Sequence, residues 1–245
     1  MQRVSRLKTA AVNGVSPPCY CGNKSNAQPF FLTYAVGGEL TSGAFFGQRR
    51  RPQDGIGVHA NFMVAPVKTR VVREGSTSSV SSTVFGLDAG LFYRLALLPK
   101  KALTPDVRLG VGLHRFIFPL KNTQYTSVNY SAVDLNLGVD VPLHPHLGAF
   151  AGVDLRPGLK AGQQATRLLG TPKAGFGIGT QVGLRGGVSR ALFELAFRFD
   201  RYQVPFRGVT NLPDMPTSNG TEIQFNDVKL TDQTLTLMLR GGVAF

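Results

Sequence analysis

Apolar and polar side chains alternate along most of this chain with a period of two residues. In the final segment, one set of alternate positions is apolar or glycine: Leu235, Leu237, Leu239, Gly241, Val243 and Phe245. The other set is mostly small or polar: Asp232, Thr234, Thr236, Met238, Arg240 and Gly242. Successive side chains of a strand point to opposite faces of its sheet. The pattern therefore predicts an amphipathic β-strand at this end of the chain.

Six earlier segments repeat the alternation, at residues 84–95, 106–117, 127–143, 147–155, 174–187 and 190–202. Two more, 33–46 and 55–64, alternate less regularly. Ordinary strands have about 5–6 residues, whereas a tilted strand that crosses a membrane needs about 9–11. Each of the regular segments is long enough to cross a bilayer. No stretch approaches the roughly 18 uninterrupted apolar residues of a transmembrane helix.

The connections between these segments alternate in length. Those at 98–104, 143–146 and 187–189 are short, whereas those at 121–126, 158–173 and 206–227 are generally longer and more polar. Short turns at one end and long loops at the other are typical of an antiparallel up-and-down meander. We predict an all-β, antiparallel up-and-down transmembrane β-barrel over residues 29–245, after a polar tail at 1–28. Eight strands are favoured because bacterial single-chain barrels have even counts, and ten are the alternative if part of 18–31 pairs.

Composition favours an apolar outer face. The chain has 29 glycines in 245 residues, only 17% charged residues and a net charge of +13. A soluble domain carries roughly 25% charged residues, and its water-exposed strand faces are usually rich in Lys and Glu. The polar faces here carry glycine beside isolated charges, which fits the interior of a narrow tube. The alternative is a soluble ligand-binding barrel of lipocalin type, favoured by the lack of an apolar secretory core near the start.

Charged or titratable side chains occur on nearly every predicted strand, and we expect them to line the barrel lumen. The set is Asp88, Arg94, Arg108, His114, Asp134, Asp140, Asp154, Arg156, Arg185, Glu194, Arg198, Asp200 and Arg240. Strand spacing predicts pairs between Glu194 and Arg240 and between Asp88 and His114. It also aligns Gly177 roughly with Arg198. An eight-stranded tube is just wide enough for its own side chains to fill it, so it should conduct little, whereas ten strands would permit a narrow channel.

The C-terminal segment resembles the closing strand of bacterial outer-membrane barrel proteins. The resemblance rests on the alternation from Leu235 to the terminal Phe245, although Val243 stands where many members carry an aromatic residue. In that family, this segment is the signal read by the barrel-assembly machinery. By size and loop pattern, the chain looks like the small eight-stranded members. The resemblance implies a location in the cell outer membrane and the assembly machinery as a partner.

Several basic residues flank the predicted long loops: Lys121, Lys160, Arg167, Lys173, Arg207 and Lys229. They do not form a stripe interleaved with stacking aromatic residues, so a nucleic-acid partner is not expected. In an outer membrane, this end would face phosphorylated lipopolysaccharide, and Lys or Arg side chains there would pair with phosphates. We expect a structural or surface-interaction role, and the sequence leaves the oligomeric state open.

No catalytic, cofactor-binding or metal-binding residue is predicted. His144 and His146 lie in a short turn, but a stable metal site needs three or four ligands. His114 with Ser127 or Ser131 would need a third, orienting group to act as a hydrolase, and a lumen pair with Asp88 explains this histidine adequately. The glycines at 175–179 keep the period of a strand, which excludes a phosphate-binding loop before a helix. Two cysteines, Cys19 and Cys21, are too few for a disulfide scaffold.

Overall fold

The computed structural model describes residues 2–8, 34–41, 55–73, 76–97, 105–119, 127–144, 146–188, 191–208 and 228–243. Its strands are β1 (Gln2–Lys8), β2 (Tyr34–Thr41), β3 (Ile56–Arg73), β4 (Ser76–Ala96), β5 (Asp106–Phe118), β6 (Val128–His144), β7 (Leu147–Leu159), β8 (Thr171–Pro172), β9 (Gly175–Val188), β10 (Ala191–Arg207) and β11 (Lys229–Val243). One short α-helix, α2 (Gln163–Leu169), lies between β7 and β8. Among the described residues, no helix has the length and apolar character needed to cross a membrane.

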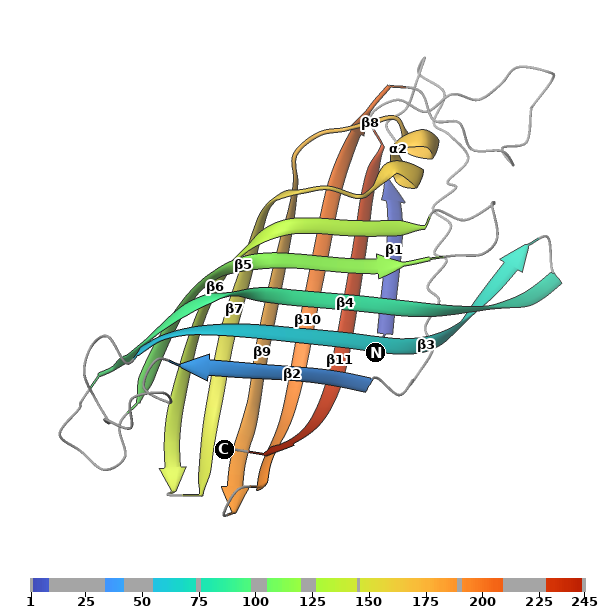
Figure 1. Cartoon of the computed structure of the whole chain (residues 1–245). Coiled ribbons are helices and arrows are strands. Elements are labelled where there is room, and N and C mark those ends of the chain that lie inside the picture. Colours follow the sequence, from blue (N-terminus) through green and yellow to red (C-terminus); the bar gives the residue numbers. More distant parts are fainter. Residues whose placement is uncertain are drawn as a thin grey trace, which may run out of the picture.

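The strands form one antiparallel sheet in the order β1-β11-β10-β9-β7-β6-β5-β4-β3-β2, with β8 paired to β10. Apart from β1, neighbours along this path follow one another in sequence, as an up-and-down meander requires. The sheet curls strongly, so that β2 and β3 cross in front of β10 and β11 (Figure 1). The predicted all-β antiparallel meander is confirmed. The predicted count of eight is not, since the path contains ten strands.

The tenth strand comes from a segment that the sequence did not point to. β1 pairs with β11 from Gln2–Leu235 to Lys8–Lys229. It lies inside the stretch 1–28 that was expected to be a polar tail, rather than in 18–31. Charged side chains in this stretch hid its strand pattern. The division into tail and barrel stays a prediction, because residues 9–33 lie outside the described part of the chain.

Successive strands run in opposite directions, which gives the sheet two distinct ends. β5, β7 and β10 end at the side of the sheet that carries α2, here called the helix end (Figure 1). β4, β6 and β9 end at the other side, here called the short-turn end. The segment 158–173 was expected to be a loop but holds α2 and β8. Gly162 and Gly170, with φ of 84° and 97°, let the chain reverse on either side of the helix.

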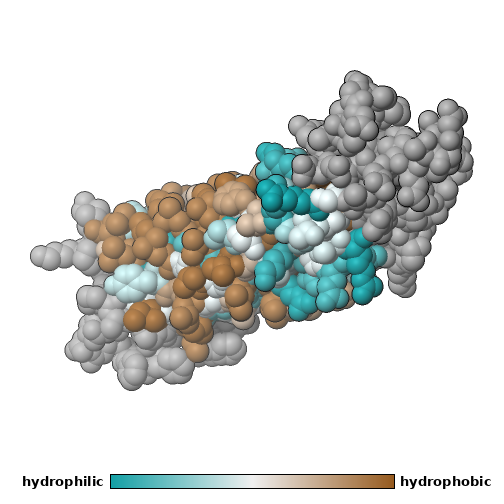
Figure 2. Space-filling view, turned by 90° about the horizontal axis from the view of Figure 1, so that it is seen from above, coloured by the Kyte–Doolittle hydropathy of each residue, from teal (hydrophilic) through white to brown (hydrophobic). Residues whose placement is uncertain are grey.

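In the half of the sheet near the short turns, large apolar side chains face outward. Leu113 is 68% exposed, Phe197 55% and Leu237 54%. Figure 2 shows such brown side chains gathered over one part of the wall and teal ones over the rest. The alternate positions of the same strands face the concave side and carry charges and glycines. This is the orientation that the alternation predicted for a membrane barrel.

In the half near α2 the chemistry of the two faces is exchanged. The concave side there holds one apolar cluster: Ala65, Val84, Phe116, Phe118, Val128, Tyr130, Leu159, Ala161, Ala165, Leu169, Tyr202, Val204, Phe206, Val228 and Leu230. The convex side of this half carries exposed polar residues such as Arg115 and Arg201. The strands keep their period through the exchange. On β10, Phe199 points outward and Asp200 inward, and then Arg201 points outward and Tyr202 inward.

Candidate functional site

The centre of the interior is a network of buried ions around Arg156, whose side chain is fully buried. Its guanidinium donates to Asp134 from Nε at 2.8 Å, to Asp200 from Nη1 at 2.8 Å and to Asp154 from Nη2 at 3.1 Å. These partners come from β6, β10 and β7. A buried ion is tolerated in a protein only when it is paired and hydrogen-bonded, as this one is.

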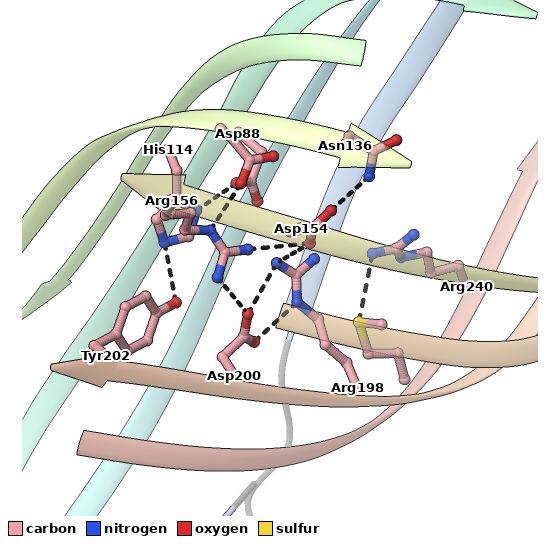
Figure 3. Close-up of polar contacts among 11 residues, drawn as sticks. Asp88, His114, Asn136, Asp154, Arg156, Arg198, Asp200, Tyr202 and Arg240 are labelled. Atoms are coloured by element: carbon pink, nitrogen blue, oxygen red, sulfur yellow. Dashed lines mark hydrogen bonds and ion pairs between the residues drawn. The ribbon is translucent and has the colours of Figure 1, made fainter. Parts of the chain in front are cut away.

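A second guanidinium shares two of these carboxylates. Arg198 donates from Nε to Asp200 at 2.9 Å and from Nη2 to Asp154 at 3.2 Å, as Figure 3 shows. Glycine makes room for this cluster. A Cβ atom on Gly179 would lie 2.7 Å from a carboxylate oxygen of Asp200 and 3.0 Å from Nη2 of Arg156. This explains why glycine occupies the inward positions of β9 at this depth.

On the helix side of this network lies a stack of rings that crosses the interior. His114 on β5 contacts Asp88 through Nδ1, and its Nε2 lies 3.0 Å from the hydroxyl of Tyr202 on β10. β6, β7 and β9 separate these two strands in the sheet, so the contact passes across the hollow of the curl. Tyr202 also stacks on Tyr130 at a centroid distance of 4.8 Å. The Tyr130 hydroxyl donates to Asp232 on β11 at 2.6 Å, which ties β6 to β11 in the same way.

On the other side of the network, nearer the short turns, four arginines lie on the interior face of the sheet. Glu39 on β2 pairs with two of them, Arg94 and Arg108. Arg185 lies 3.2 Å from Asp140, and Arg240 donates to Glu194 at 2.9 Å. We call these residues the mouth group: Glu39, Arg94, Arg108, Asp140, Arg185, Glu194 and Arg240.

Aromatic rings hold two mouth arginines in place. The guanidinium of Arg108 lies 4.1 Å from the ring centroid of Phe92, and that of Arg185 lies 4.5 Å from the centroid of Phe150. An arginine over an aromatic face is stabilised by the ring quadrupole. Both phenylalanines are buried on the interior face. The arginines are thus positioned by their own wall and not only by their carboxylate partners.

A polar cavity of about 100 Å³ lies between the central network and the mouth group. Its lining includes both sets of charges: Glu39, Asp88, Arg108, Asp134, Asp140, Asp154, Arg185, Glu194, Arg198 and Arg240, together with His59, Asn61, Asn136 and Gln181. Toward the helix end, the apolar cluster follows the network along the strands. The cavity is therefore closed on the helix side by ion pairs and apolar side chains.

All thirteen side chains expected in the lumen belong to these contacts, and the expected Glu194–Arg240 and Asp88–His114 pairs are present. The expected alignment of Gly177 with Arg198 was wrong. Arg198 lies opposite Gln181, and Gly177 lies opposite Tyr202. The observed register differs from the expected one by four residues. A shift by an even number keeps every side chain on its face, so alternation alone does not select between the two.

Sequence reasoning missed five interior residues: Glu39, His59, Tyr130, Tyr202 and Asp232. Glu39 and His59 lie in the weakly alternating N-terminal segments. The two tyrosines lie where the apolar residues change faces, and they were not read as part of the polar interior. The clue to both was the polar residue beside each tyrosine on the outward face: Arg201 beside Tyr202, and Asn129 and Ser131 beside Tyr130.

The other predicted sets are placed as follows. Leu235, Leu237 and Leu239 are exposed on the convex face of β11, while Gly241 and Val243 continue that strand. Phe245 and Lys121 lie outside the described residues. Lys160, Arg167, Lys173 and Arg207 are exposed at the helix end, and Lys229 is partly buried at the start of β11. Cys19 and Cys21 also lie outside the described part of the chain.

The candidate chemistry considered from sequence is not assembled among the described residues. The rings of His144 and His146 lie 5.6 Å apart, and no group of three or more His, Cys, Asp or Glu suited to a metal ion occurs in the described ranges. His114 contacts Asp88 and Tyr202. The glycines at 175–179 lie within strand β9, as expected.

No family model matches this chain, and no curated protein matches it. Among solved structures, the chain is similar to a protein described as "Outer-membrane expressed OmpT of Vibrio cholerae", with a TM-score of 0.34 and 10% identity. The match covers 84% of this chain and 56% of that one, so the chain spans little more than half of its neighbour's length. A likeness of this degree assigns neither family nor function.

Proposed function

We propose that this protein is an outer-membrane β-barrel with a closed interior and a structural or surface-interaction role at its helix end. The observation that carries the proposal is the belt of outward apolar side chains over an interior of buried ion pairs. A water-soluble barrel has the reverse arrangement. If this protein were water-soluble, it would expose Leu113, Phe197, Leu237 and their neighbours to water as one apolar surface. Such a surface is far larger than monomeric soluble proteins tolerate.

The belt has the height that a bilayer requires. On β6 the outward positions from 133 to 143 are all Val or Leu, and on β11 those from 235 to 243 are apolar or glycine. A tilted strand needs about 9–11 residues to cross the hydrocarbon core. Toward the helix end, outward positions become polar, as at Ser131 on β6 and Arg115 on β5. This half of the wall would stand outside the hydrocarbon.

The packing of the interior favours a barrel that does not conduct ions. The central ion network fills the tube at mid-height, and the apolar cluster follows it toward α2. The runner-up function is a narrow channel, which the ten-stranded path makes worth testing. Planar-bilayer recordings separate the two. We expect no conductance steps above the background of protein-free bilayers, and reproducible steps would favour the channel.

The helix end is the surface that would meet partners outside the cell. Lys160, Arg167, Lys173 and Arg207 are exposed there, and outer-membrane lipopolysaccharide presents phosphates at that level. The alternation on β11 would serve as the segment read by the barrel-assembly machinery. Both partners follow from the proposed location in the outer membrane.

A charge-reversal variant tests the lipopolysaccharide contact. Replacing Lys160, Arg167 and Lys173 by Glu should weaken lipopolysaccharide binding by about tenfold or more, because each charged hydrogen bond contributes roughly 1.5–3 kcal/mol. Binding is measured on the folded barrel in detergent, with Arg94→Gln in the interior as the control for charge loss alone. Unchanged binding in the triple variant would remove lipopolysaccharide from the proposal.

A further inference from the structure

The polar cavity has two ends that differ in charge. Its inner end is bounded by the carboxylates of Asp88, Asp134, Asp154 and Asp200, against the two guanidiniums of Arg156 and Arg198. His114 adds at most one positive charge to this group. The four carboxylates therefore exceed the cations at this end, and three of them, Asp88, Asp134 and Asp154, line the cavity itself.

The mouth is balanced instead. Three of its arginines line the cavity, Arg108, Arg185 and Arg240, and so do its three carboxylates, Glu39, Asp140 and Glu194. In addition, not every N–H donor of these arginines has a hydrogen-bond acceptor. The Nε atoms of Arg94, Arg108 and Arg185 are buried and have no partner among the described residues. Arg108 and Arg185 line the cavity while their guanidiniums rest on Phe92 and Phe150.

Buried polar atoms without partners are rare in native proteins and point to a missing partner. His59 Nδ1 is unpartnered in the same way, and His59 lines the cavity. If the lumen were only a filled plug, each guanidinium would be expected to use its donors on a neighbouring carboxylate, as Arg156 and Arg198 do. In contrast, mouth arginines that line the cavity retain unpartnered N–H donors.

We propose that this cavity binds a small zwitterion of the α-amino acid class, with its ammonium group toward Asp88, Asp134 and Asp154 and its carboxylate toward Arg108 and Arg185. A guanidinium matches a carboxylate in shape and charge, and an ammonium group suits a carboxylate-rich end. An apolar cavity of about 150 Å³ holds benzene, so one of about 100 Å³ takes roughly four to six heavy atoms. Glycine and alanine have this size.

The geometry also indicates the side from which the ligand enters the cavity. Among the described residues, the network and the apolar cluster close the helix side, which leaves the short-turn end as the side of access. If the proposed outer-membrane location holds, short turns face the periplasm, and the ligand is a periplasmic solute. The binding itself depends only on the interior and not on the membrane.

Three small probes separate the charges of the ligand: glycine, acetate and methylammonium. Each is titrated against the full chain, folded in detergent micelles, by calorimetry. Glycine should bind at least about tenfold more tightly than either single-charge probe, because only glycine reaches both ends of the cavity. Equal affinities for the three probes, or no glycine binding at millimolar concentration, would overturn the proposal.

A matched pair of variants locates the site. Arg185→Gln at the mouth should weaken glycine binding about tenfold and leave methylammonium unchanged, whereas Arg207→Gln at the helix end should change neither. If Arg185→Gln loses the strand signal in circular dichroism, Arg108→Gln takes its place with the same expectation. Equal glycine affinity in the mouth and helix-end variants would place binding elsewhere. Flotation with vesicles, which tests membrane insertion, is scored separately, so the two proposals can fail independently.

Discussion

The short-turn half and the helix half of this sheet are built from the same strands with the same period, yet their two faces have opposite chemistry. Near the short turns, apolar side chains point outward and ions point inward. Near α2, Arg115 and Arg201 point outward, while Phe116 and Tyr202 point inward. Alternation by itself therefore predicts only that a strand has one apolar and one polar face. The surroundings of each half decide which face is apolar, and here they differ between the ends of single strands.

The difference also assigns a role to each half. The short-turn half has an apolar outer surface, as a protein in a hydrocarbon environment does, and its charges lie on the interior face. The helix half has the surface of a protein dissolved in water and hides an apolar cluster, into which Ala165 and Leu169 of α2 are packed. In the proposed outer-membrane location, a wall that extends beyond the bilayer on one side would need this change. Three pairs of substitutions test this comparison. Each pair makes the same kind of change at two positions that the account treats as different.

The largest effect is expected from the central ion network. Arg156→Met would leave three carboxylates buried without their shared cation, and it should lower the free energy of unfolding by roughly 3–5 kcal/mol. Arg201→Met removes the same group from the exposed face of the helix half and should change stability by no more than about 0.5 kcal/mol. Urea unfolding in lipid vesicles measures both. Equal losses would mean that Arg156 is not the centre of the interior.

Next in size is an arginine placed on the outer wall. Phe197→Arg puts a charge in the apolar belt, and the expected cost in vesicles is roughly 2–4 kcal/mol. Gln203→Arg lies on the same face of the same strand, six residues nearer the helix end, and should cost no more than about 0.5 kcal/mol. The same unfolding measurement applies. Similar costs at both positions would show that the belt does not end where the polar outer residues begin.

The smallest effect concerns the space that glycine leaves in the interior. Gly179→Ala would press its Cβ against Asp200 and Arg156, and overpacking of this kind costs about 1–3 kcal/mol. Gly38→Ala on β2 meets no atom within 4 Å and should be close to neutral. A neutral Gly179→Ala would indicate that the network can move away from β9.

The sequence predicted which residues face the interior because period-two alternation is a local property of a strand. It did not predict the strand count, since β1 lies in a basic segment without regular alternation, and this segment pairs with β11. The register could not be predicted either, as the Gly177–Tyr202 pair shows, because a slip by an even number of residues, here four, preserves both faces. The helix α2 was missed because a seven-residue helix between two glycines carries almost no periodic signal.

Contacts across the hollow could not be predicted either. His114 meets Tyr202, and Tyr130 meets Asp232, only because the sheet curls until distant strands face one another. Such pairs depend on the diameter of the curl, which depends in turn on the number and tilt of the strands. The charges that pair between adjacent strands, such as Glu194 and Arg240, could be predicted from strand spacing alone.

The central claim is that the wall near the short turns lies in hydrocarbon and the wall near α2 lies in water. The chain contains no tryptophan, so a single introduced tryptophan reports its own surroundings. Phe197→Trp and Gln203→Trp, each folded into vesicles whose lipids carry bromine on the acyl chains, compare the two levels of β10. We predict strong quenching and blue-shifted emission at position 197, and weak quenching with red-shifted emission at 203. Weak quenching at position 197 in a protein that fails to float with the vesicles would contradict the account and indicate a water-soluble barrel.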